Sequence, residues 1–151
     1  MKTELPRNWR NCNPLNVRRT NTQWQGLKEV QNDKSFHVFK SMKWGWRAAF
    51  KTLNTYYTAR GLHTVGQIIA RWAPPEENNT LNYREWVTAA IGIPADQPLP
   101  PPDSSEGRPV WIRLAVAMAF YEGMLQPHQL LRVDLWEVVE GWQLAFGDAS
   151  G

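Results

Sequence analysis

The sequence has little cysteine and no long apolar run. Cys12 is its single cysteine, so no disulfide can form within the chain, which is consistent with synthesis in a reducing compartment. The N-terminal Met-Lys-Thr-Glu-Leu-Pro lacks the apolar core of a signal peptide, and no stretch approaches the length of a membrane span. We therefore expect a protein made in the cytoplasm that does not insert into a membrane.

Several kinds of catalytic motif are also missing. His37, His63 and His128 are scattered and form no zinc pattern such as His-Glu-x-x-His, so no metal site is predicted. There is no glycine-rich phosphate loop, and no cofactor is expected. Cys12 lies in a turn-rich segment with no evident helix N-terminus to lower the pKa of its thiol, which disfavours a cysteine peptidase.

Tryptophan is the residue that stands out in the composition. The 151 residues include nine Trp, with 42% hydrophobic and 21% charged residues, which otherwise suits one soluble globular domain spanning 1–151. Indole rings fill cores, and they also provide flat faces on which sugars or bases stack. The net charge of +3 suits an acidic partner such as a cell-wall polymer, a nucleic acid or a membrane surface, without selecting one.

The order of local patterns predicts a mainly α (α+β) fold with a small N-terminal β-patch. Residues 1–34 are rich in Asn and Arg, and short strands are predicted at 15–18, after Trp24-Gln-Gly26, and at 36–39. Residues 93–109 form a Pro-rich internal loop. With Ser41, Thr64 and Thr80 as N-caps, the sequence predicts helices that end at Gly61, Ala73 and Gly92. Two further helices are predicted from about Val110 to Gly123 and from about Pro127 to Phe146. The predicted inner face of the last helix carries Leu131, Leu135, Val138, Val139, Trp142 and Phe146.

One acid ends an apolar helical run. The stretch Leu114-Ala-Val-Ala-Met-Ala-Phe-Tyr-Glu-Gly presents Glu122 just before Gly123, and Pro127 follows. Partial desolvation and the negative end of the helix dipole would both raise the pKa of such a carboxyl and suit it to donate a proton near neutral pH. The alternative is that Glu122 lies on a solvated last turn.

Three N-terminal segments resemble the β-region of flagellar and autolysin-type cell-wall glucosaminidases. They are Arg10-Asn-Cys-Asn-Pro-Leu-Asn-Val-Arg18, Trp24-Gln-Gly26 and Phe36-His-Val-Phe-Lys-Ser-Met42. The later Trp72-Ala-Pro-Pro-Glu-Glu-Asn-Asn-Thr-Leu-Asn-Tyr83 is similar to a Tyr-Ala-Thr-Asp-Pro-x-Tyr motif of the same family. The resemblance covers roughly residues 10–92 and implies a lysozyme-like fold.

The whole chain also resembles phage and prophage proteins labelled as virion structural proteins. These share Arg-Asn-Asn-Asn-Pro-x-Asn-Ile-Arg, then Trp-Ala-Pro-Pro-x-Glu-Asn-x-Thr, then a late Glu-Asn-Gly-x-Gln-Pro. The present sequence departs from that pattern at Cys12 and at Gly123-Met124. The resemblance implies association with a virion.

The position of the acid departs from the glucosaminidases, whose catalytic Glu precedes the Asn-rich segment. Here only Glu4 precedes it. Glu122-Gly-Met-Leu-Gln-Pro127 resembles the Glu-Ser-Gly-x-Asn-Pro that ends the catalytic helix of lytic transglycosylases. We therefore hypothesise a circularly permuted order, in which the acid-bearing helix follows the β-region, because such permutations are tolerated when chain termini lie close together.

Together these patterns predict cleavage of the peptidoglycan glycan strand by a single glutamate general acid, as a muramidase, glucosaminidase or lytic transglycosylase. Glu122 is the first candidate and Glu77 its competitor, although Glu77 also suits binding or helix capping. Glu29 and Asp33 are weaker candidates for a second acid. The predicted substrate-binding residues are Asn11, Asn13, Asn16, Trp24, Trp72, Asn78, Thr80 and Tyr83, and the three Asn in the 11–16 segment suit turns equally well.

The alternative function is a non-catalytic virion or cell-wall-binding protein that keeps the lysozyme-like fold. A nucleic-acid surface is permitted by basic residues that interleave with two tryptophans: Arg7, Arg10, Arg18, Arg19 and Lys28 with Trp9 and Trp24. The acidic C-terminal helix disfavours nucleic acid as the partner. A monomer or a virion-associated protein is expected. Without an export signal, a protein made in the bacterial cytoplasm would reach the wall as a virion component, through a holin or by a secretion machine.

Overall fold

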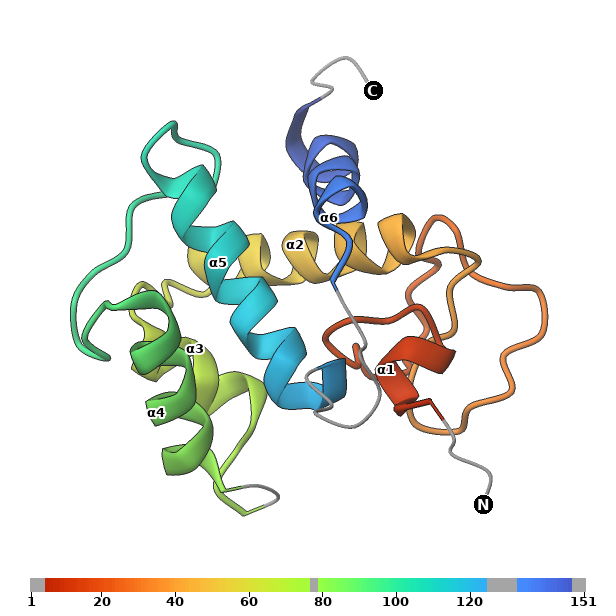
Figure 1. Ribbon diagram of the computed structural model, residues 1–151, viewed down its shortest axis with the longest axis horizontal. Coiled ribbons are helices and arrows are strands. Elements are labelled where there is room, and N and C mark those ends of the chain that lie inside the picture. Colours follow the sequence, from red (N-terminus) through yellow and green to blue (C-terminus); the bar gives the residue numbers. More distant parts are fainter. Residues whose placement is uncertain (1–4, 77–78, 125–132, 148–151) are drawn as a thin grey trace. The chain divides into compact units, whose positions relative to one another are not determined.

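The computed structural model describes residues 5–76, 79–124 and 133–147. This part of the chain is mainly helical, as predicted (Figure 1). The chain divides into two compact units: unit 1 comprises Met1–Lys51 and Glu122–Gly151, and unit 2 comprises Thr52–Tyr121. A single domain spanning 1–151 and a lysozyme-like architecture both stay predictions.

The helices follow the predicted order, with one addition near the N-terminus. They are α1 (Arg7–Arg10), α2 (Met42–Thr58), α3 (Val65–Trp72), α4 (Thr80–Ile91), α5 (Gly107–Ala119) and α6 (Leu135–Trp142), with the π-helical turns η1 (Phe120–Met124) and η2 (Gln143–Gly147). The short helix α1 was not predicted, because four residues are too few to show helical periodicity.

The predicted strands are wrong in extent. Among the described residues they are reduced to two isolated antiparallel bridges, Arg18 with Phe36 and Leu27 with Phe39. The backbone there bonds to side chains instead of to a ladder: Asn13 Oδ1 accepts from Val17 N at 2.8 Å, and Gln31 Oε1 accepts from Val38 N at 2.8 Å. Leu15, Val17, Val38 and Phe39 of these segments are nevertheless buried, so the predicted strands marked several core positions.

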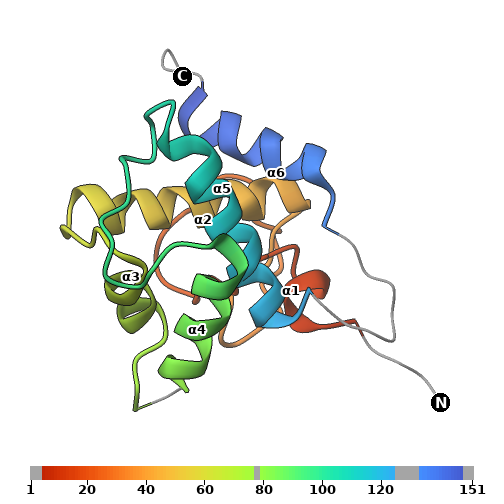
Figure 2. The same ribbon diagram turned by 60° about the vertical axis from the view of Figure 1, so that its left-hand side comes forward.

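In unit 1, α6 packs on the first half of α2 (Figures 1 and 2). Gly141 makes this approach possible, because a Cβ there would lie 2.3 Å from Trp46 Cβ. The rings of Phe50 and Trp142 meet edge to face with centroids 5.1 Å apart. Val138 and Trp142 are buried as predicted.

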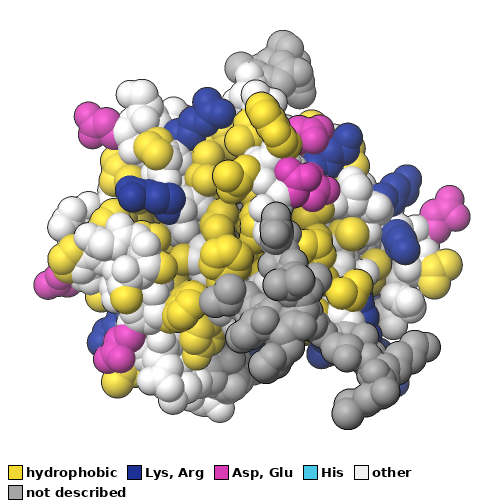
Figure 3. All heavy atoms as spheres, viewed as in Figure 1, with side chains coloured by type: hydrophobic (Ala, Val, Ile, Leu, Met, Phe, Trp, Pro, Cys, Tyr) yellow, Lys and Arg dark blue, Asp and Glu magenta, His cyan; other side chains and the backbone are white. Residues whose placement is uncertain are grey.

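The predicted start of this last helix near Pro127 lies outside the described residues, but residues 133 and 134 are not helical and Asp134 caps α6. The prediction of a buried Leu135 is wrong: Leu135 is 65% exposed, because it occupies the first position of α6, ahead of the face that contacts α2. Acidic and hydrophobic side chains lie together in the region of α6 (Figure 3).

Unit 2 packs α4 against both α3 and α5 (Figure 2). Thr64 caps α3 and Gly92 ends α4, both as predicted. The cap at Thr64 is a reciprocal capping box with Gln67, and Gly92 is left-handed. The Pro-rich loop lies on this core: Leu99 is buried, and the indole of Trp111 donates to the Pro100 carbonyl at 2.8 Å.

The fourth predicted helix begins earlier than Val110, at Gly107, where a Cβ would collide with the Pro101 carbonyl oxygen. Across the described ranges, no helix is both long and apolar enough to span a bilayer.

Candidate functional site

The Asn-rich segment of unit 1 is held by its own side chains. Asn13 is fully buried, and its amide donates to the carbonyls of Val17 and His37 at 3.1 and 2.9 Å while accepting from Val17 N. Asn8 is also fully buried and donates to the Pro14 carbonyl at 3.0 Å. Of the two roles open to Asn13, the structure therefore assigns it the fixing of a turn, because no atom of Asn13 reaches the surface.

Asn16 connects this segment to the acid that ends the apolar helix. Its Nδ2 donates to Oε1 of Glu122 at 3.0 Å, and both residues are half-buried. Asn16 has a left-handed backbone, with φ of 52°, a conformation that Asn tolerates better than most residues. The predicted general acid thus lies beside one of the predicted substrate-binding residues, although 106 positions separate them.

Gly123 anchors the turn that carries this acid. Its φ of 141° is accessible to glycine and strained for other residues. A Cβ at Gly123 would lie 3.0 Å from Asn8 Oδ1 and 3.2 Å from Pro6 Cβ. The close approach fixes the end of η1 against the start of α1, which places Glu122 next to the Asn-rich segment.

Asp33 organises the other side of the same segment. Arg7 donates to both carboxylate oxygens at 2.8 Å, and Asn11 donates to Oδ2 at 3.0 Å. The backbone N–H groups of Ser35 and Phe36 also donate to this carboxylate. The hydrogen bonds from Arg7, followed by those from Asn11 and the backbone, hold the pKa of Asp33 far below its ordinary value. Asp33 is thus a bound, ionised structural carboxylate, which does not suit it to act as a second catalytic acid.

Trp24 lines a hollow of unit 1 that does not include Glu122. We call it the polar hollow. Its volume is about 580 Å³. It is lined by Arg19, Thr20, Asn21, Thr22, Gln23, Trp24, Gly26, Leu27, Lys28, Glu29, Gln31 and His37. His37 is 2% exposed, and its Nε2 accepts from the N–H of Thr20 at 3.2 Å. Burial and then the charge of Arg19 lower the pKa of His37, so the ring is neutral at pH 7.

Cys12 also belongs to unit 1. Burial, followed by the charge of Glu137, raises the pKa of its thiol. A raised thiol pKa lowers the thiolate fraction at neutral pH. Within the described ranges no three His, Cys, Asp or Glu side chains gather closely enough to hold a metal ion.

The remaining described candidates lie in unit 2. Thr80 donates its hydroxyl to the Ala73 carbonyl, and the cap of α4 is Asn79 rather than the predicted Thr80, with Asn79 Oδ1 accepting from Asn82 N at 3.1 Å. Tyr83 is buried and stacks on Tyr121 with centroids 4.1 Å apart.

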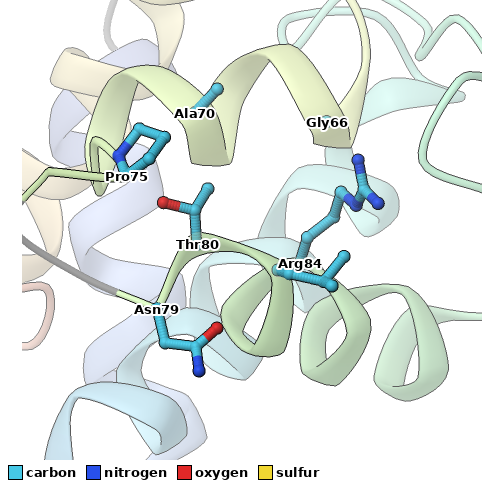
Figure 4. Close-up of a pocket in the computed structure, with 7 residues that line it drawn as sticks. Gly66, Ala70, Pro75, Asn79, Thr80 and Arg84 are labelled. Carbon is cyan, nitrogen blue, oxygen red and sulfur yellow. The ribbon is translucent and has the colours of Figure 1, made fainter.

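Trp72 is half-buried and meets Tyr56 edge to face, with ring centroids 6.1 Å apart. Thr80 borders a groove of about 740 Å³ between α3 and α4, together with Ala70, Pro75 and Arg84 (Figure 4). Glu77 and Asn78 lie outside the described residues.

Sequence reasoning missed Asn8, Arg7 and His37. Asn8 was not distinguished from the other Asn residues, and Arg7 was assigned only to a general basic surface. The partner of Arg7 is 26 positions away, so local patterns gave no sign of their pairing.

Comparison with known proteins finds similarity to a bacteriophage protein. No protein-family model matches it. It is similar to Protein P5 of Pseudoalteromonas phage PM2, with 43% identity over 99 residues. The match covers 64% of this chain and 62% of the phage protein, so the chain spans less than two thirds of that relative's length.

Proposed function

We propose that this is a phage-associated protein that cleaves the glycan strand of peptidoglycan with Glu122 as general acid. The observation that carries the proposal is the hydrogen bond from Asn16 Nδ2 to Glu122 Oε1. In the permuted order the catalytic acid follows the Asn-rich segment in the sequence instead of preceding it. The fold must therefore bring Glu122 back beside that segment. The similarity to a phage protein supports the phage context.

The chemistry needs one proton donor held in a fixed position. A carboxylic acid must protonate the leaving glycosidic oxygen, and catalysis depends on its orientation. The Asn16 amide holds Oε1 of Glu122 in position. Arg7 donates to both carboxylate oxygens of Asp33, so Asp33 is not available as a second catalytic acid. A route that needs a single acid is therefore favoured.

The second candidate is a non-catalytic virion or wall-binding protein. The similarity to Protein P5 favours this candidate more directly than it favours an enzyme, because the name of that relative gives a phage and no enzymatic activity. In this case Glu122 and Asn16 would be a structural pair that joins the two stretches of chain that make up unit 1.

Digestion of purified sacculi distinguishes the two candidates. The wild type is compared with Glu122→Gln and with Glu85→Gln, an exposed glutamate on α4, as the matched control. The enzyme proposal expects released muropeptides from the wild type and the control, and none from folded Glu122→Gln. Mass analysis of the ends then assigns the reaction: anhydro ends mean transglycosylation and reducing ends mean hydrolysis.

Two results would reject the assignment of Glu122. If Glu122→Gln digests sacculi at the wild-type rate, another acid must act, and Glu77→Gln is the next variant to test. If no variant and no wild-type sample digests any sacculus while all bind it, the non-catalytic candidate takes its place.

A further inference from the structure

The polar hollow of unit 1 is separate from the proposed catalytic acid. None of its lining residues is Glu122, Asn16 or any member of the segment 8–16. Its walls come from residues 19–31 and from His37, so one continuous stretch of chain builds most of it. A concave surface of this kind, in the same unit as a candidate catalytic group, is suited to holding part of a long substrate.

The lining groups favour a neutral, hydroxyl-rich ligand. Thr20, Asn21, Thr22 and Gln23 are exposed and carry hydroxyl or amide groups that both donate and accept hydrogen bonds. The charged groups do not accumulate one sign. Arg19 donates to the carbonyls of Gln31 and Asp33 at 3.2 and 2.9 Å, and Lys28 is followed directly by Glu29.

Trp24 provides the apolar part of this surface. The indole is half-buried, and its Nε1 is buried with no hydrogen-bond partner among the described residues. The accessible part of the ring is therefore carbon, not the N–H group. Such a surface suits the C–H face of a pyranose, which stacks on an aromatic ring while its hydroxyls reach neighbouring amides.

The hollow is pre-organised by hydrogen bonds. His37 Nε2 fixes the N–H of Thr20, and Thr20 Oγ1 accepts from the N–H of Thr22 at 3.2 Å. Gln31 holds the opposite wall, because its Nε2 donates to the carbonyls of Lys28 and Val38 at 2.9 and 2.8 Å. A wall that is already ordered lowers the entropic cost of binding.

We infer that the polar hollow binds an N-acetylhexosamine unit of a glycan strand, stacked on Trp24, and so holds the polymer at a point separate from Glu122. The choice of ligand rests on the proposed function, since the same chemistry describes the strand that Glu122 would cut.

Binding is measured with chitotetraose as the probe, using the full-length Glu122→Gln variant so that the ligand stays intact. The indole N–H signals of the nine tryptophans are followed by NMR. The Trp24 signal, identified by its loss in Trp24→Ala, should move on titration. Trp24→Ala should weaken binding roughly tenfold or more, because the stacking surface is lost. Trp136→Ala is the matched control, since Trp136 is 80% exposed on α6 and lies outside the hollow.

The double variant Asn21→Ala with Gln23→Ala keeps the test decisive if Trp24→Ala does not fold. Both side chains are exposed, and their removal should weaken binding several-fold. The inference is overturned if chitotetraose does not bind, or if it binds the wild type and all hollow variants equally. It is also overturned if single-stranded DNA moves the Trp24 signal at lower concentration than the sugar and with a steep dependence on salt.

Failure of the enzyme proposal looks different. A protein that binds chitotetraose through Trp24 but never digests sacculi loses the catalytic assignment and keeps the glycan site. The opposite result is also possible. If digestion of sacculi depends on Glu122, and Trp24→Ala binds and digests as well as the wild type, the catalytic assignment is kept and the glycan site is rejected.

Discussion

The side-chain amide of Asn16 donates a 3.0 Å hydrogen bond to Glu122 across 106 positions of sequence. The contact joins a left-handed residue of the Asn-rich segment to the acid in η1. If the pair is catalytic, its geometry orients a proton donor. If it is only structural, it still fixes the start of the C-terminal segment of unit 1.

Substitution of Asn16 should separate its backbone role from its side-chain role. Asn16→Ala loses the bond to Glu122 and also strains a backbone with φ of 52°, so we expect a loss of about 1–3 kcal/mol in the free energy of unfolding. Asn16→Gly loses the same bond without the strain and should be the more stable variant. Urea denaturation measures both, and a Gly variant less stable than the Ala variant would contradict the backbone argument.

Removal of the charge on Asp33 should lower the free energy of unfolding and should also make that free energy less dependent on pH in acid. The folded pKa of Asp33 lies below its unfolded value, so the folded state binds the proton less readily, and the stabilisation is present above pH 4 and lost as the pH falls. Asp33→Asn should cost about 1–3 kcal/mol at pH 7, since Arg7 loses a bidentate partner.

The measurement for Asp33 is the denaturation midpoint as a function of pH between 7 and 3. Asp103→Asn, an exposed carboxylate in the Pro-rich loop, is the matched control. A parallel loss of stability with acid in wild type and Asp33→Asn would show that other groups cause the acid sensitivity.

His37 should make unit 1 less stable in mild acid. Its pKa is lowered by burial and then by Arg19, so folding opposes protonation. The contribution of neutral His37 to the free energy of unfolding is complete above the ordinary histidine pKa of about 6.5. This contribution decreases as the pH falls from there through the folded pKa of His37. His37→Gln should flatten the dependence between pH 7 and 5, and His63→Gln, an exposed histidine of unit 2, should not. Thermal melts across this range provide the test.

Gly45 should resist the substitution that usually strengthens a helix. Alanine is favoured over glycine inside helices by about 1 kcal/mol, but a Cβ at Gly45 would lie 2.0 Å from the Cys12 carbonyl oxygen. We therefore expect Gly45→Ala to destabilise by about 2–3 kcal/mol. Gly61→Ala is the comparison, because its Cβ meets nothing within 4 Å and only its φ of 66° opposes the change. Equal melting temperatures for the two variants would refute the steric argument.

Local chemistry made the unit 2 helices predictable. The cap at Thr64 and the helix end at Gly92 are signals contained within one turn of chain, and both act as the sequence predicts. The strands near the N-terminus failed because Asn13 and Gln31 satisfy backbone groups that a ladder would have paired, and alternation does not report such competition. The unpredicted Arg7–Asp33 pair depends on distance in space, which periodicity does not encode.

Part of the candidate site could be predicted, because one resemblance suggested that two segments far apart in the sequence would lie close together in the fold. The hydrophobic run before Glu122 located an acid, and the permuted order suggested that the Asn-rich segment would lie near it, but neither singled out Asn16 as its partner. The position of Trp24 in a separate hollow was not predicted, because a tryptophan's neighbours along the chain do not show which surface it joins.

The split of unit 1 between Met1–Lys51 and Glu122–Gly151 sets an order of events during synthesis. The ribosome completes the continuous unit 2 before it makes the second half of unit 1. Residues 1–51 can therefore complete unit 1 only after the segment from Glu122 onward leaves the exit tunnel. Released chains that end at Tyr121 should accordingly protect unit 2 from protease while leaving the Asn-rich segment open to cleavage.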